Sequence, residues 1–470
     1  MVFTMVPASF ADSPDAGEYY VKVGVKYGSS APSEVKISAP GGLKLSMVSG
    51  NEQPPEPNAE SYIELHTSIT VVNTDGILEA LDDNGEHICY LSGNGQEFIS
   101  AASYYDDNEA ISIDGQKYRG GVILNLNSSS QMDVINYVNS EDYLRGVLHA
   151  EIGQSSALEA IKAQAVTARS FLYGNKNKHK SQGFGVCTTT HCQVYKGVSG
   201  EYAKTDQAVE ETRGIIMYYG GVPVSAYYSA NSGGHTQNNE DVWGGSKVGY
   251  LRGKKDEFSP EYTWTVKLTK AQLESAVAGK GVGDITSISI DSYNSAGAVA
   301  SLTVKGTSGT YTVKKDAIRN MFSGTSLKST MFKLSSEGGS TTSPEGSYAE
   351  QSPKASVYAM DSYGAKVKLG SSLFAVSSSG VSKINLAGTH ILGADGAKDV
   401  VDAGSGDGES PTAVSADTIY LDDDSDVVIF SGRGYGHGVG MSQQGAQVMG
   451  KQGYSYVDIL EYYFTDVEIK

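Results

Sequence analysis

The sequence predicts an α+β fold, in which a β-rich scaffold of mixed strands and short helices carries a central helical pair and a substrate groove. Three observations lead to this prediction. Alternating apolar residues and turn signals dominate residues 19–128, whereas apolar residues recur at helical spacing between residues 134 and 174. Strand-like runs and short helical patterns return between residues 187 and 333. The 470 residues are enough for two or three domains that each bury a core.

Five segments are expected along the chain. Residues 1–11 are apolar and end in small residues, which is typical of the remnant of a secretory signal peptide, with an ordinary chain terminus as the alternative. A β-rich leading region follows at 12–130, and a core with the helical pair occupies 131–334. Residues 335–430 combine a Ser- and Gly-rich flexible linker with a β-like insertion. Residues 431–470, a glycine-rich motif and a helix, complete the core.

The central helical pair is located by residue spacing and caps. Ser140 is expected to cap a first helix that ends at Gly153, because apolar residues recur at three and four positions between them. Residues 156–159, Ser-Ala-Leu-Glu, have the pattern of a capping box, which predicts that a second helix begins there. This second helix is expected to stop at Gly174.

Shorter elements follow the helical pair. Helices are expected near residues 206–213 and 270–278. The strand-like runs 215–219 and 222–228 flank two glycines, and this pattern predicts a β-hairpin.

The charge of the chain argues against two classes of partner. The 36 Lys and Arg residues against 54 Asp and Glu residues give a net charge of −18. A negative surface repels phosphate backbones and anionic lipids, so nucleic acid is not expected as a partner. No run approaches the ~20 apolar residues of a membrane helix, and no transmembrane segment is expected. The 30 tyrosines favour a sugar as the ligand, because tyrosine combines an apolar ring with a hydroxyl group.

Glu151 is the main candidate for acid catalysis. It lies on the apolar stripe of its helix, four residues after Val147 and three after Leu148, and two residues before Gly153. Burial and the negative helix end both raise the pKa of a carboxyl group, which is how proteins make a general acid. The alternative is that the helical pattern slips at this end and leaves Glu151 exposed.

A second carboxyl group is harder to find. Glycosidases usually need two, roughly 5 to 10 Å apart. Glu141 and Asp142 lie about 14 Å back along the same helix, which is too far. Asp241, close before Trp243, is a candidate, although an aspartate in this position is more commonly a turn cap.

Two glycine-containing segments are candidates for ligand binding. Residues 227–236 form a polar loop after a strand, and such loops on a rigid scaffold hold ligands. A serine there could pair with His235 as a nucleophile, but the chain has no G-x-S-x-G motif. Residues 432–440 carry glycine at every second position, so an extended strand would have one bare face and one face with Arg433 and Tyr435. A phosphate-binding loop lacks support because its Lys-Ser/Thr ending is missing, and a flexible linker is the other alternative.

Several motifs, taken in order, resemble the stage II sporulation protein D and amidase enhancer family. They are residues 134–152, 160–169, 191–195, 228–236, 241–244 and 432–446. The sequence departs from the family in three places. Ile152-Gly153 stands where Met-Pro is common, Tyr435 stands where Trp is common, and residues 345–430 enlarge the interval before the last motif.

The resemblance implies a peptidoglycan lytic transglycosylase in which Glu151 matches the catalytic glutamate. The expected reaction cleaves glycan strands that lack stem peptides and leaves 1,6-anhydro-muramyl ends. The acid protonates the glycosidic oxygen and the sugar's own 6-hydroxyl group attacks, so no second carboxyl group is required. The groups expected to hold the glycan are Gln193, Tyr195, Tyr228, Ser229, Ser232, His235, Thr236, Arg433, Tyr435, His437 and Gln443.

The second family name supports an alternative of another class. The chain could be a non-catalytic protein that binds wall glycan and recruits or enhances an N-acetylmuramoyl-alanine amidase. Both alternatives predict an extracytoplasmic, secreted or wall-associated protein, with the sporulation septum as one location. Peptidoglycan strands are the expected partner in both, and a cell-wall amidase in the second.

Four residues are expected to bind a metal ion. Some members of the family hold zinc with Cys and His in this stretch, and Cys187, His191, Cys192 and His179 are the matching residues here. Four ligands of these types suit structural zinc. A local disulfide, with Cys89 left over, and free thiols are the alternatives. No organic cofactor is expected.

Overall fold

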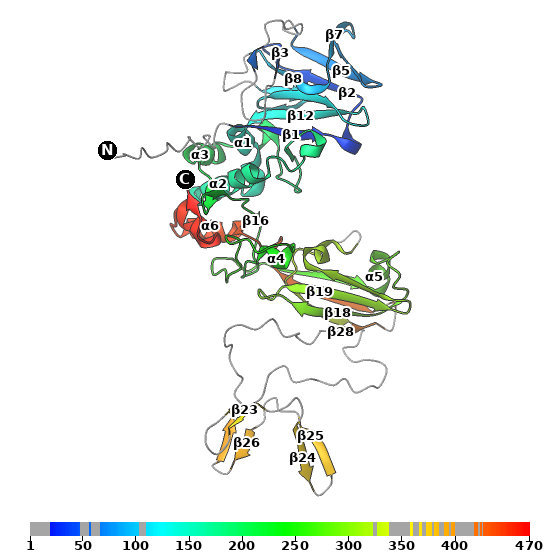
Figure 1. The fold of residues 1–470 in the computed structure, drawn as a ribbon, viewed down its shortest axis with the longest axis vertical. Helices are drawn as coiled ribbons and strands as arrows, with labels where there is room; N and C mark the ends of the chain where they lie inside the picture. The colour runs from blue at the N-terminus through cyan, green and yellow to red at the C-terminus, as the bar shows by residue number, and fades with distance from the viewer. Residues whose placement is uncertain are drawn as a thin grey trace, which may run out of the picture. The chain divides into compact units, whose positions relative to one another are not determined.

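The structure is a computed structural model. It describes residues 19–47, 66–102, 110–322, 327–337, 418–421, 424 and 426–470, together with short strands at 56–57 and between 358 and 399. The expected signal-peptide remnant at 1–11 lies outside the described residues, as does most of the expected linker and insertion at 335–430. Many strands in several sheets and seven α-helices among the described residues confirm the predicted α+β fold (Figure 1).

The chain divides into two compact units. Unit 1 contains residues 1–239, 246–261 and 438–470, and unit 2 contains residues 240–245 and 262–437. No helix among the described residues is long and apolar enough to cross a membrane.

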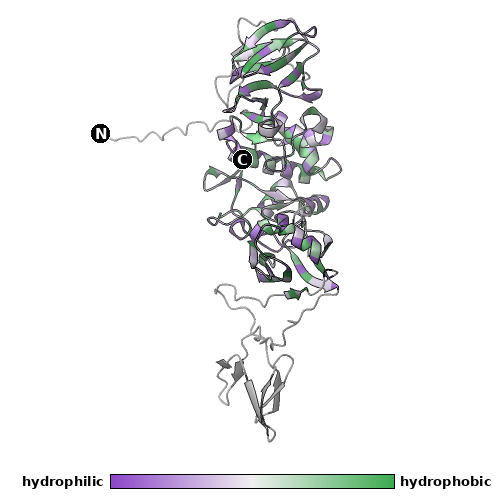
Figure 2. Ribbon diagram, turned by 90° about the vertical axis from the view of Figure 1, so that its right-hand side faces the viewer, coloured by the Kyte–Doolittle hydropathy of each residue, from purple (hydrophilic) through white to green (hydrophobic). Residues whose placement is uncertain are grey.

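Two large sheets form the N-terminal part of unit 1. The first is seven-stranded, in the order β13-β1-β12-β11-β8-β3-β4. Its strands are β13 (Val186–Cys187), β1 (Tyr20–Lys26), β12 (Met132–Asn139), β11 (Gly121–Leu126), β8 (Asn94–Ala101), β3 (Leu43–Met47) and β4 (Glu56–Pro57). The second is six-stranded, with β10 (Gln116–Tyr118), β9 (Ile111–Ile113), β2 (Glu34–Ser38), β5 (Ser68–Thr74), β6 (Ile77–Leu81) and β7 (His87–Leu91) in that order. Hydrophobic and hydrophilic residues are interleaved along these strands (Figure 2), as expected for sheets with one face on a core.

The helical pair follows strand β12 directly. Helix α1 (Ser140–Glu151) ends before Gly153, which has a φ of +73°, so this predicted end is confirmed. The cap at the start is Asn139 rather than Ser140, because the Asn139 side chain at the end of β12 accepts a hydrogen bond from the Glu141 N–H. Helix α2 (Leu158–Asn175) is the second member of the pair.

Two details of the second helix differ from the prediction. The capping box at 156–159 does not form, because the Ser156 hydroxyl donates to the Ile152 carbonyl at the open end of α1 and leaves Ala157 as the cap. The helix also continues past Gly174. This glycine is needed for packing, since a Cβ atom there would lie 2.2 Å from the Ser225 hydroxyl.

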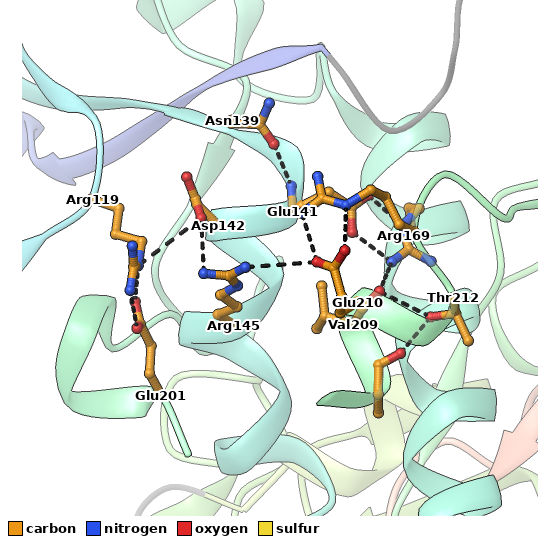
Figure 3. Close-up of polar contacts among 12 residues, drawn as sticks. Arg119, Asn139, Glu141, Asp142, Arg145, Arg169, Glu201, Val209, Glu210 and Thr212 are labelled. Atoms are coloured by element: carbon orange, nitrogen blue, oxygen red, sulfur yellow. Dashed lines mark hydrogen bonds and ion pairs between the residues drawn. The ribbon is translucent and has the colours of Figure 1, made fainter. Parts of the chain in front are cut away.

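A buried ion pair fixes α1 against α2. The Arg169 guanidinium donates two hydrogen bonds of 2.7 Å to the Glu141 carboxylate, and both side chains are almost fully buried. Arg169 also donates to the Ile215 carbonyl at 3.0 Å. Figure 3 shows Arg169 beside Glu141 and Val209, whose carbonyl oxygen accepts a further bond of 3.4 Å. Removing one partner of such a pair costs about 3–5 kcal/mol, because the other charge is left buried and unpaired. Glu141 therefore has a structural role, and it had already been excluded as the second carboxyl group by its distance from Glu151 along the helix.

The rest of unit 1 consists of short helices and short strands. They are α3 (Ala203–Glu211), β14 (Met217–Tyr219), β15 (Val222–Pro223), β16 (Tyr228–Ser229), β30 (Met441–Ser442), α6 (Gln443–Lys451), α7 (Tyr456–Tyr463) and β31 (Glu468–Ile469), with α4 (Asn239–Val242) at the boundary between the units. The predicted hairpin is confirmed, since Tyr219 pairs with Val222 across the two glycines. Its second strand is shorter than expected, and Tyr228 pairs instead with Met441 in the parallel pair β16–β30.

Unit 2 is built on two antiparallel sheets around one apolar core. One sheet contains β17 (Thr263–Thr269), β29 (Val427–Arg433) and β21 (Phe332–Glu337). The other contains β20 (Thr310–Lys314), β19 (Val299–Gly306), β18 (Ile285–Tyr293) and β28 (Thr418–Tyr420), and helix α5 (Lys270–Ala276) confirms the predicted later helix. Further strands form antiparallel pairs, namely β22 (Tyr358–Met360) with β23 (Lys366–Lys368), β24 (Leu373–Ser377) with β25 (Gly380–Ile384), and β26 (His390–Gly393) with β27 (Gly396–Asp399).

The glycine-rich segment is not an extended strand beyond Arg433, so that expectation is wrong. Gly434, Gly436, Gly438 and Gly440 all have positive φ angles, of 79°, 108°, 72° and 73°. L-residues with a side chain rarely adopt this conformation. Close approach adds a second requirement at Gly440, where a Cβ atom would lie 2.2 Å from the Tyr227 carbonyl oxygen. The alternating glycines therefore allow a series of tight turns.

Candidate active site

The Glu151 carboxyl group lies in unit 1 at the end of α1, where three groups surround it. The backbone N–H of Val194 lies 3.4 Å from Oε1, and the Gln443 amide nitrogen lies 3.5 Å from Oε2. The Tyr228 hydroxyl is the third hydrogen-bond partner. We call Glu151, Val194, Tyr228 and Gln443 the acid site. Glu151 and Tyr228 are half-buried, so one side of the acid site stays open to solvent.

The pKa of Glu151 is raised above its ordinary value of 4.5. Burial is the cause, and the three hydrogen bonds act in the opposite direction because they favour the charged form. None of the groups that act on this pKa is a carboxyl group. The direction agrees with the sequence-based expectation, and the alternative of a freely exposed Glu151 is wrong.

A hydrogen-bond chain orients Tyr228 toward the acid. Gln193 is almost fully buried, accepts a bond of 3.3 Å from the Tyr143 hydroxyl and donates one of 3.3 Å to the Tyr228 oxygen. Because the Tyr228 oxygen already accepts from Gln193, its own proton is free to point at the Glu151 carboxylate. Gln193 is therefore a positioning residue for Tyr228.

The parallel pair β16–β30 brings Tyr228 and Gln443 to the same place. Ser229 pairs with Ser442, and the Ser442 hydroxyl caps helix α6, whose first residue is Gln443. The Gln443 amide also lies 3.4 Å from the buried Gln164 oxygen on α2. Two segments more than two hundred residues apart in the sequence thus contribute to one site.

The loop of residues 229–236 is held by contacts inside the protein. The Ser232 hydroxyl donates to the buried Asp256 carboxylate at 2.7 Å, and the Thr236 hydroxyl donates to the Lys254 carbonyl. The His235 imidazole bonds to the Thr236 carbonyl, so the serine–histidine nucleophile pair does not form. Ser229, Ser232 and Thr236 are buried, which gives these side chains a structural role in this state of the protein.

The four expected metal ligands lie together in unit 1, and we call them the metal cage. Their ligand atoms all lie within 4.8 Å of one another. His179 Nε2 is 3.2 Å from His191 Nδ1 and 3.5 Å from Cys192 Sγ. His191 Nδ1 is 3.7 Å from Cys187 Sγ and 3.8 Å from Cys192 Sγ. Cys187 and Cys192 are free thiols, so the disulfide alternative is not formed.

These distances fit a tetrahedral zinc ion. With Zn–S bonds of about 2.3 Å and Zn–N bonds of about 2.0 Å, two nitrogens would lie about 3.3 Å apart, and a nitrogen and a sulfur about 3.5 Å apart. The second ring nitrogen of His179, Nδ1, lies 2.6 Å from the Gln182 side-chain oxygen. Metal-binding histidines usually make such a hydrogen bond through the nitrogen that does not bind the metal. Burial would raise the pKa of Cys187, but hydrogen bonds from Thr189 and His191 lower it to about 6, whereas burial raises the pKa of Cys192 to about 11, so the thiolate is favoured at one of the two cysteines.

Comparison with known proteins decides the family. A model described as Stage II sporulation protein matches residues 128–219, and a domain of unknown function matches residues 253–348. The chain is 31% identical to the amidase enhancer of Bacillus subtilis over 362 residues, which are 77% of this chain and 45% of that protein. It is 33% identical to stage II sporulation protein D of Bacillus subtilis over 169 residues, 31% of this chain and 49% of that protein. The chain belongs to the stage II sporulation protein D and amidase enhancer family. It spans about half the length of the curated relatives that it matches.

The family motifs are divided between the units. Glu151, the metal cage and the 228–236 loop all lie in unit 1, as does Gln443. Tyr195 packs in the core of unit 1, where its hydroxyl donates to Asn136. Arg433, Tyr435 and His437 lie in unit 2. Asp241 also lies in unit 2, where its carboxylate accepts a bond from Ser295.

Sequence reasoning missed some members of the acid site. Val194 contributes through its backbone N–H, which no side-chain pattern reveals. Gln164 and Tyr143 support Gln443 and Gln193 from buried positions on helices. Polar residues on an otherwise apolar helix face, such as Gln164 among alanines, were the available signal for them.

Proposed function

We propose that this chain is a cell-wall protein that cleaves peptidoglycan glycan strands as a lytic transglycosylase, with Glu151 as the acid and base. One observation carries the proposal: the half-buried Glu151 carboxyl group has a raised pKa and neutral hydrogen-bond donors around it, and among the described residues of unit 1 no carboxyl group contributes to the shift of that pKa. A hydrolase would need a second group to activate water. The relatives named amidase enhancer and stage II sporulation protein D support a wall-associated protein, and the resemblance of Glu151 to the family's catalytic glutamate is the reason for choosing this reaction.

In the proposed reaction Glu151 acts first as an acid and then as a base. Protonated Glu151 donates its proton to the glycosidic oxygen, and the bond from that oxygen to the anomeric carbon of muramic acid breaks. The resulting Glu151 carboxylate is stabilised by the Tyr228 hydroxyl, the Val194 N–H and the Gln443 amide. It then takes the proton of the muramic acid 6-hydroxyl group as that oxygen bonds to the anomeric carbon. The acid is thereby restored and the product carries a 1,6-anhydro ring.

The test is the Glu151→Gln variant on denuded glycan strands. Glutamine keeps the size and hydrogen bonding of the side chain but cannot deliver a proton. We expect glycan cleavage to fall by about 10²- to 10⁴-fold or more, with glycan binding nearly unchanged. Cleavage at the wild-type rate by this variant would contradict the proposal.

A second function is supported by the similarity to a protein named amidase enhancer, which covers 77% of this chain. In this alternative the chain binds wall glycan and stimulates a separate N-acetylmuramoyl-alanine amidase without cleaving glycan itself. Glycan treated with a purified amidase, with and without this chain, distinguishes the two. Stimulation that is equal for the wild type and Glu151→Gln, with no anhydro ends, would favour the enhancer.

We also propose that the metal cage holds a structural zinc ion through His179, Cys187, His191 and Cys192. Zinc there would link the chain segments on both sides of the loop 187–192. Four protein ligands would fill the tetrahedral coordination sphere of the ion, so the substrate could not bind to it. The proposal is supported by the tetrahedral distances and the support of His179 by Gln182. Elemental analysis of protein purified without chelators should find about one zinc per chain, and a zinc-free folded protein would contradict the proposal.

A further inference from the structure

Asp256 is a buried carboxylate of unit 1 that takes no part in the proposed reaction. It is 3% exposed and lies in the segment 246–261, which belongs to unit 1 although both of its neighbouring segments in the sequence belong to unit 2. A charge is costly to bury unless hydrogen bonds replace the water that it loses. The groups that bind Asp256 therefore show what the carboxylate is for.

Four donors from three parts of unit 1 bind this carboxylate. The Ser232 hydroxyl donates to Oδ2 at 2.7 Å, and the Tyr463 hydroxyl on α7 lies 3.1 and 3.2 Å from the two oxygens. The backbone N–H groups of Phe258 and Ser259 donate to Oδ1 at 3.2 and 3.1 Å. All four donors are neutral, so hydrogen bonds link the Asp256 segment to α7 and to the loop of residues 229–236.

Tyr463 extends this contact to the start of helix α6. Burial and the charge of Asp256 raise the pKa of Tyr463, so its hydroxyl keeps the proton that it donates. The Ser442 side chain is a further hydrogen-bond partner of Tyr463, and the Ser442 oxygen caps α6 by accepting from the Gly445 N–H at 3.3 Å. The chain from Asp256 through Tyr463 to Ser442 therefore ends one residue before Gln443 of the acid site.

Gly445 leaves the space that this contact needs. A Cβ atom at this position would lie 2.0 Å from the Tyr463 hydroxyl, 3.2 Å from Asp256 Oδ2 and 3.3 Å from Ser442 Oγ. Gly445 is the third residue of α6, a position where alanine normally stabilises a helix more than glycine does. The glycine in this helix therefore serves the contact between Asp256 and Tyr463.

Ser232 connects Asp256 to the other strand of the parallel pair β16–β30. Its hydroxyl donates to Asp256, and its N–H lies 3.4 Å from Ser442 Oγ. Ser232 follows β16, which carries Tyr228, and Ser442 ends β30, directly before Gln443. Asp256 is thus linked to the ends of both strands that bring Tyr228 and Gln443 into the acid site.

The other titratable groups that act with Asp256 are directed elsewhere or stay neutral. They are Lys254, Tyr462 and Tyr463. The Lys254 ammonium group donates to the Tyr462 carbonyl at 2.8 Å and lies 3.7 Å from the centre of the Tyr462 ring. Burial raises the pKa of both tyrosines, so neither ionises near neutral pH.

We infer that Asp256 is a positioning residue, which fixes β16 and β30 together and so holds the Tyr228 hydroxyl and the Gln443 amide on the Glu151 carboxyl group. This inference rests on the proposed function. The two hydrogen bonds lower the pKa of Glu151 against the effect of burial. They favour the carboxylate form, which has to take the proton of the 6-hydroxyl group in the proposed reaction.

The test is Asp256→Asn, with the pKa of Glu151 as the readout. Asparagine keeps an oxygen for the two backbone N–H groups but places an NH₂ donor where the Ser232 and Tyr463 hydroxyls now donate. The pKa of Glu151 follows, without any substrate, from the pH dependence of the gain in melting temperature that Glu151→Gln produces in each background.

We expect Asp256→Asn to raise the pKa of Glu151 by about one pH unit, because looser bonds from Tyr228 and Gln443 favour the carboxylate less. The stabilisation from the Glu151 proton is then lost at a higher pH, so the gain from Glu151→Gln continues to a higher pH. On denuded glycan, kcat should fall about tenfold and the basic limb of its pH profile should move upward by the same amount as the pKa.

Two further variants keep the inference testable. Tyr463→Phe removes one donor, is milder than Asp256→Asn, and should raise the pKa of Glu151 in the same direction. Asp133→Asn is the matched control for an equal chemical change. Asp133 is 2% exposed on β12, where it accepts a bond of 3.1 Å from the Asn127 side chain. This control should leave the pKa of Glu151 unchanged, whatever its effect on the melting temperature.

The outcomes separate this inference from the proposed reaction. If the pKa of Glu151 is unchanged in Asp256→Asn and Tyr463→Phe, or shifts equally in Asp133→Asn, the positioning role is wrong and the reaction stands wherever the wild type cleaves glycan. If the wild type cleaves nothing but Asp256→Asn still raises the pKa of Glu151, the reaction is wrong and the positioning role stands.

Discussion

The acid site and the metal cage of unit 1 share the segment 191–194 but are built in different ways. In the metal cage, His179, Cys187 and Cys192 are buried and His191 is exposed, and the histidine nitrogens lie 3.2–3.8 Å from neighbouring ligand atoms. In the acid site, Glu151 and Tyr228 are half-buried and two hydrogen bonds to Glu151 are long, at 3.4 and 3.5 Å. A cluster that only holds the chain can direct all four ligand side chains at one point, whereas an acid that exchanges its proton with a substrate must stay accessible to that substrate.

The shared segment makes the two clusters dependent on each other. Cys192 precedes Gln193, which orients Tyr228, and Val194, which donates to Glu151. A fixed position of Cys192 therefore places two groups of the acid site. Changes in the cage should disturb both stability and activity, while changes in the acid site should affect activity far more than stability.

The largest effect is expected from Cys192→Ser, which breaks the cage. We predict loss of bound zinc, a fall in the unfolding free energy of several kcal/mol, and loss of glycan cleavage because Gln193 and Val194 are released. Cys89→Ser is the matched control, since Cys89 lies on β7, outside the cage. Thermal unfolding with elemental analysis checks this prediction, and a Cys192→Ser protein as stable and active as Cys89→Ser would show that the clusters are independent.

A smaller effect is expected from Tyr228→Phe, which removes one hydrogen bond to Glu151. A hydrogen bond to a charged group contributes about 1.5–3 kcal/mol, so kcat should fall by about 10- to 100-fold with the melting temperature nearly unchanged. Tyr227→Phe is the neighbouring control and should keep the wild-type rate. An unchanged kcat in Tyr228→Phe would remove Tyr228 from the acid site.

The smallest effect concerns the stability of Glu151→Gln as a function of pH. The folded protein holds the Glu151 proton more tightly than the unfolded chain, because burial raises the pKa above 4.5. This proton stabilises the folded protein fully at pH values below the ordinary pKa of 4.5. The stabilisation is lost as the pH rises through the raised pKa of the folded protein. The variant should therefore gain melting temperature relative to the wild type between about pH 4 and pH 7. A difference that stays constant over this range would mean that the pKa is not raised.

The two clusters also differ in how well the sequence predicts them. The four residues of the metal cage all lie between 179 and 192, and the resemblance to the family indicated them as a group of ligands. Glu151 was identified from the apolar stripe of α1, a local pattern with a physical consequence for its pKa. The convergence of Tyr228 and Gln443 depends on the parallel pair β16–β30, and pairing between such distant segments leaves no periodic signal in either.

Local rules failed where tertiary contacts compete. Ser156 could cap α2, but the open end of α1 takes its hydroxyl, and Gly174 looked like a helix end although it is required for packing against Ser225. The alternating glycines at 434–440 matched a strand in composition, yet their positive φ angles give turns. The α+β fold itself was predictable because it depends on hydrophobic periodicity, which each element carries in its own residues.

The most direct test of the central claim is the chemistry of the product. Denuded glycan is digested in oxygen-18 water, and the new ends are analysed by mass spectrometry for the wild type and for Glu151→Gln. We predict 1,6-anhydro-muramyl ends without oxygen-18 from the wild type and almost no new ends from the variant, because the sugar's own hydroxyl group replaces water. Reducing ends that carry oxygen-18, or new ends formed equally by Glu151→Gln, would contradict a single-glutamate lytic cleavage.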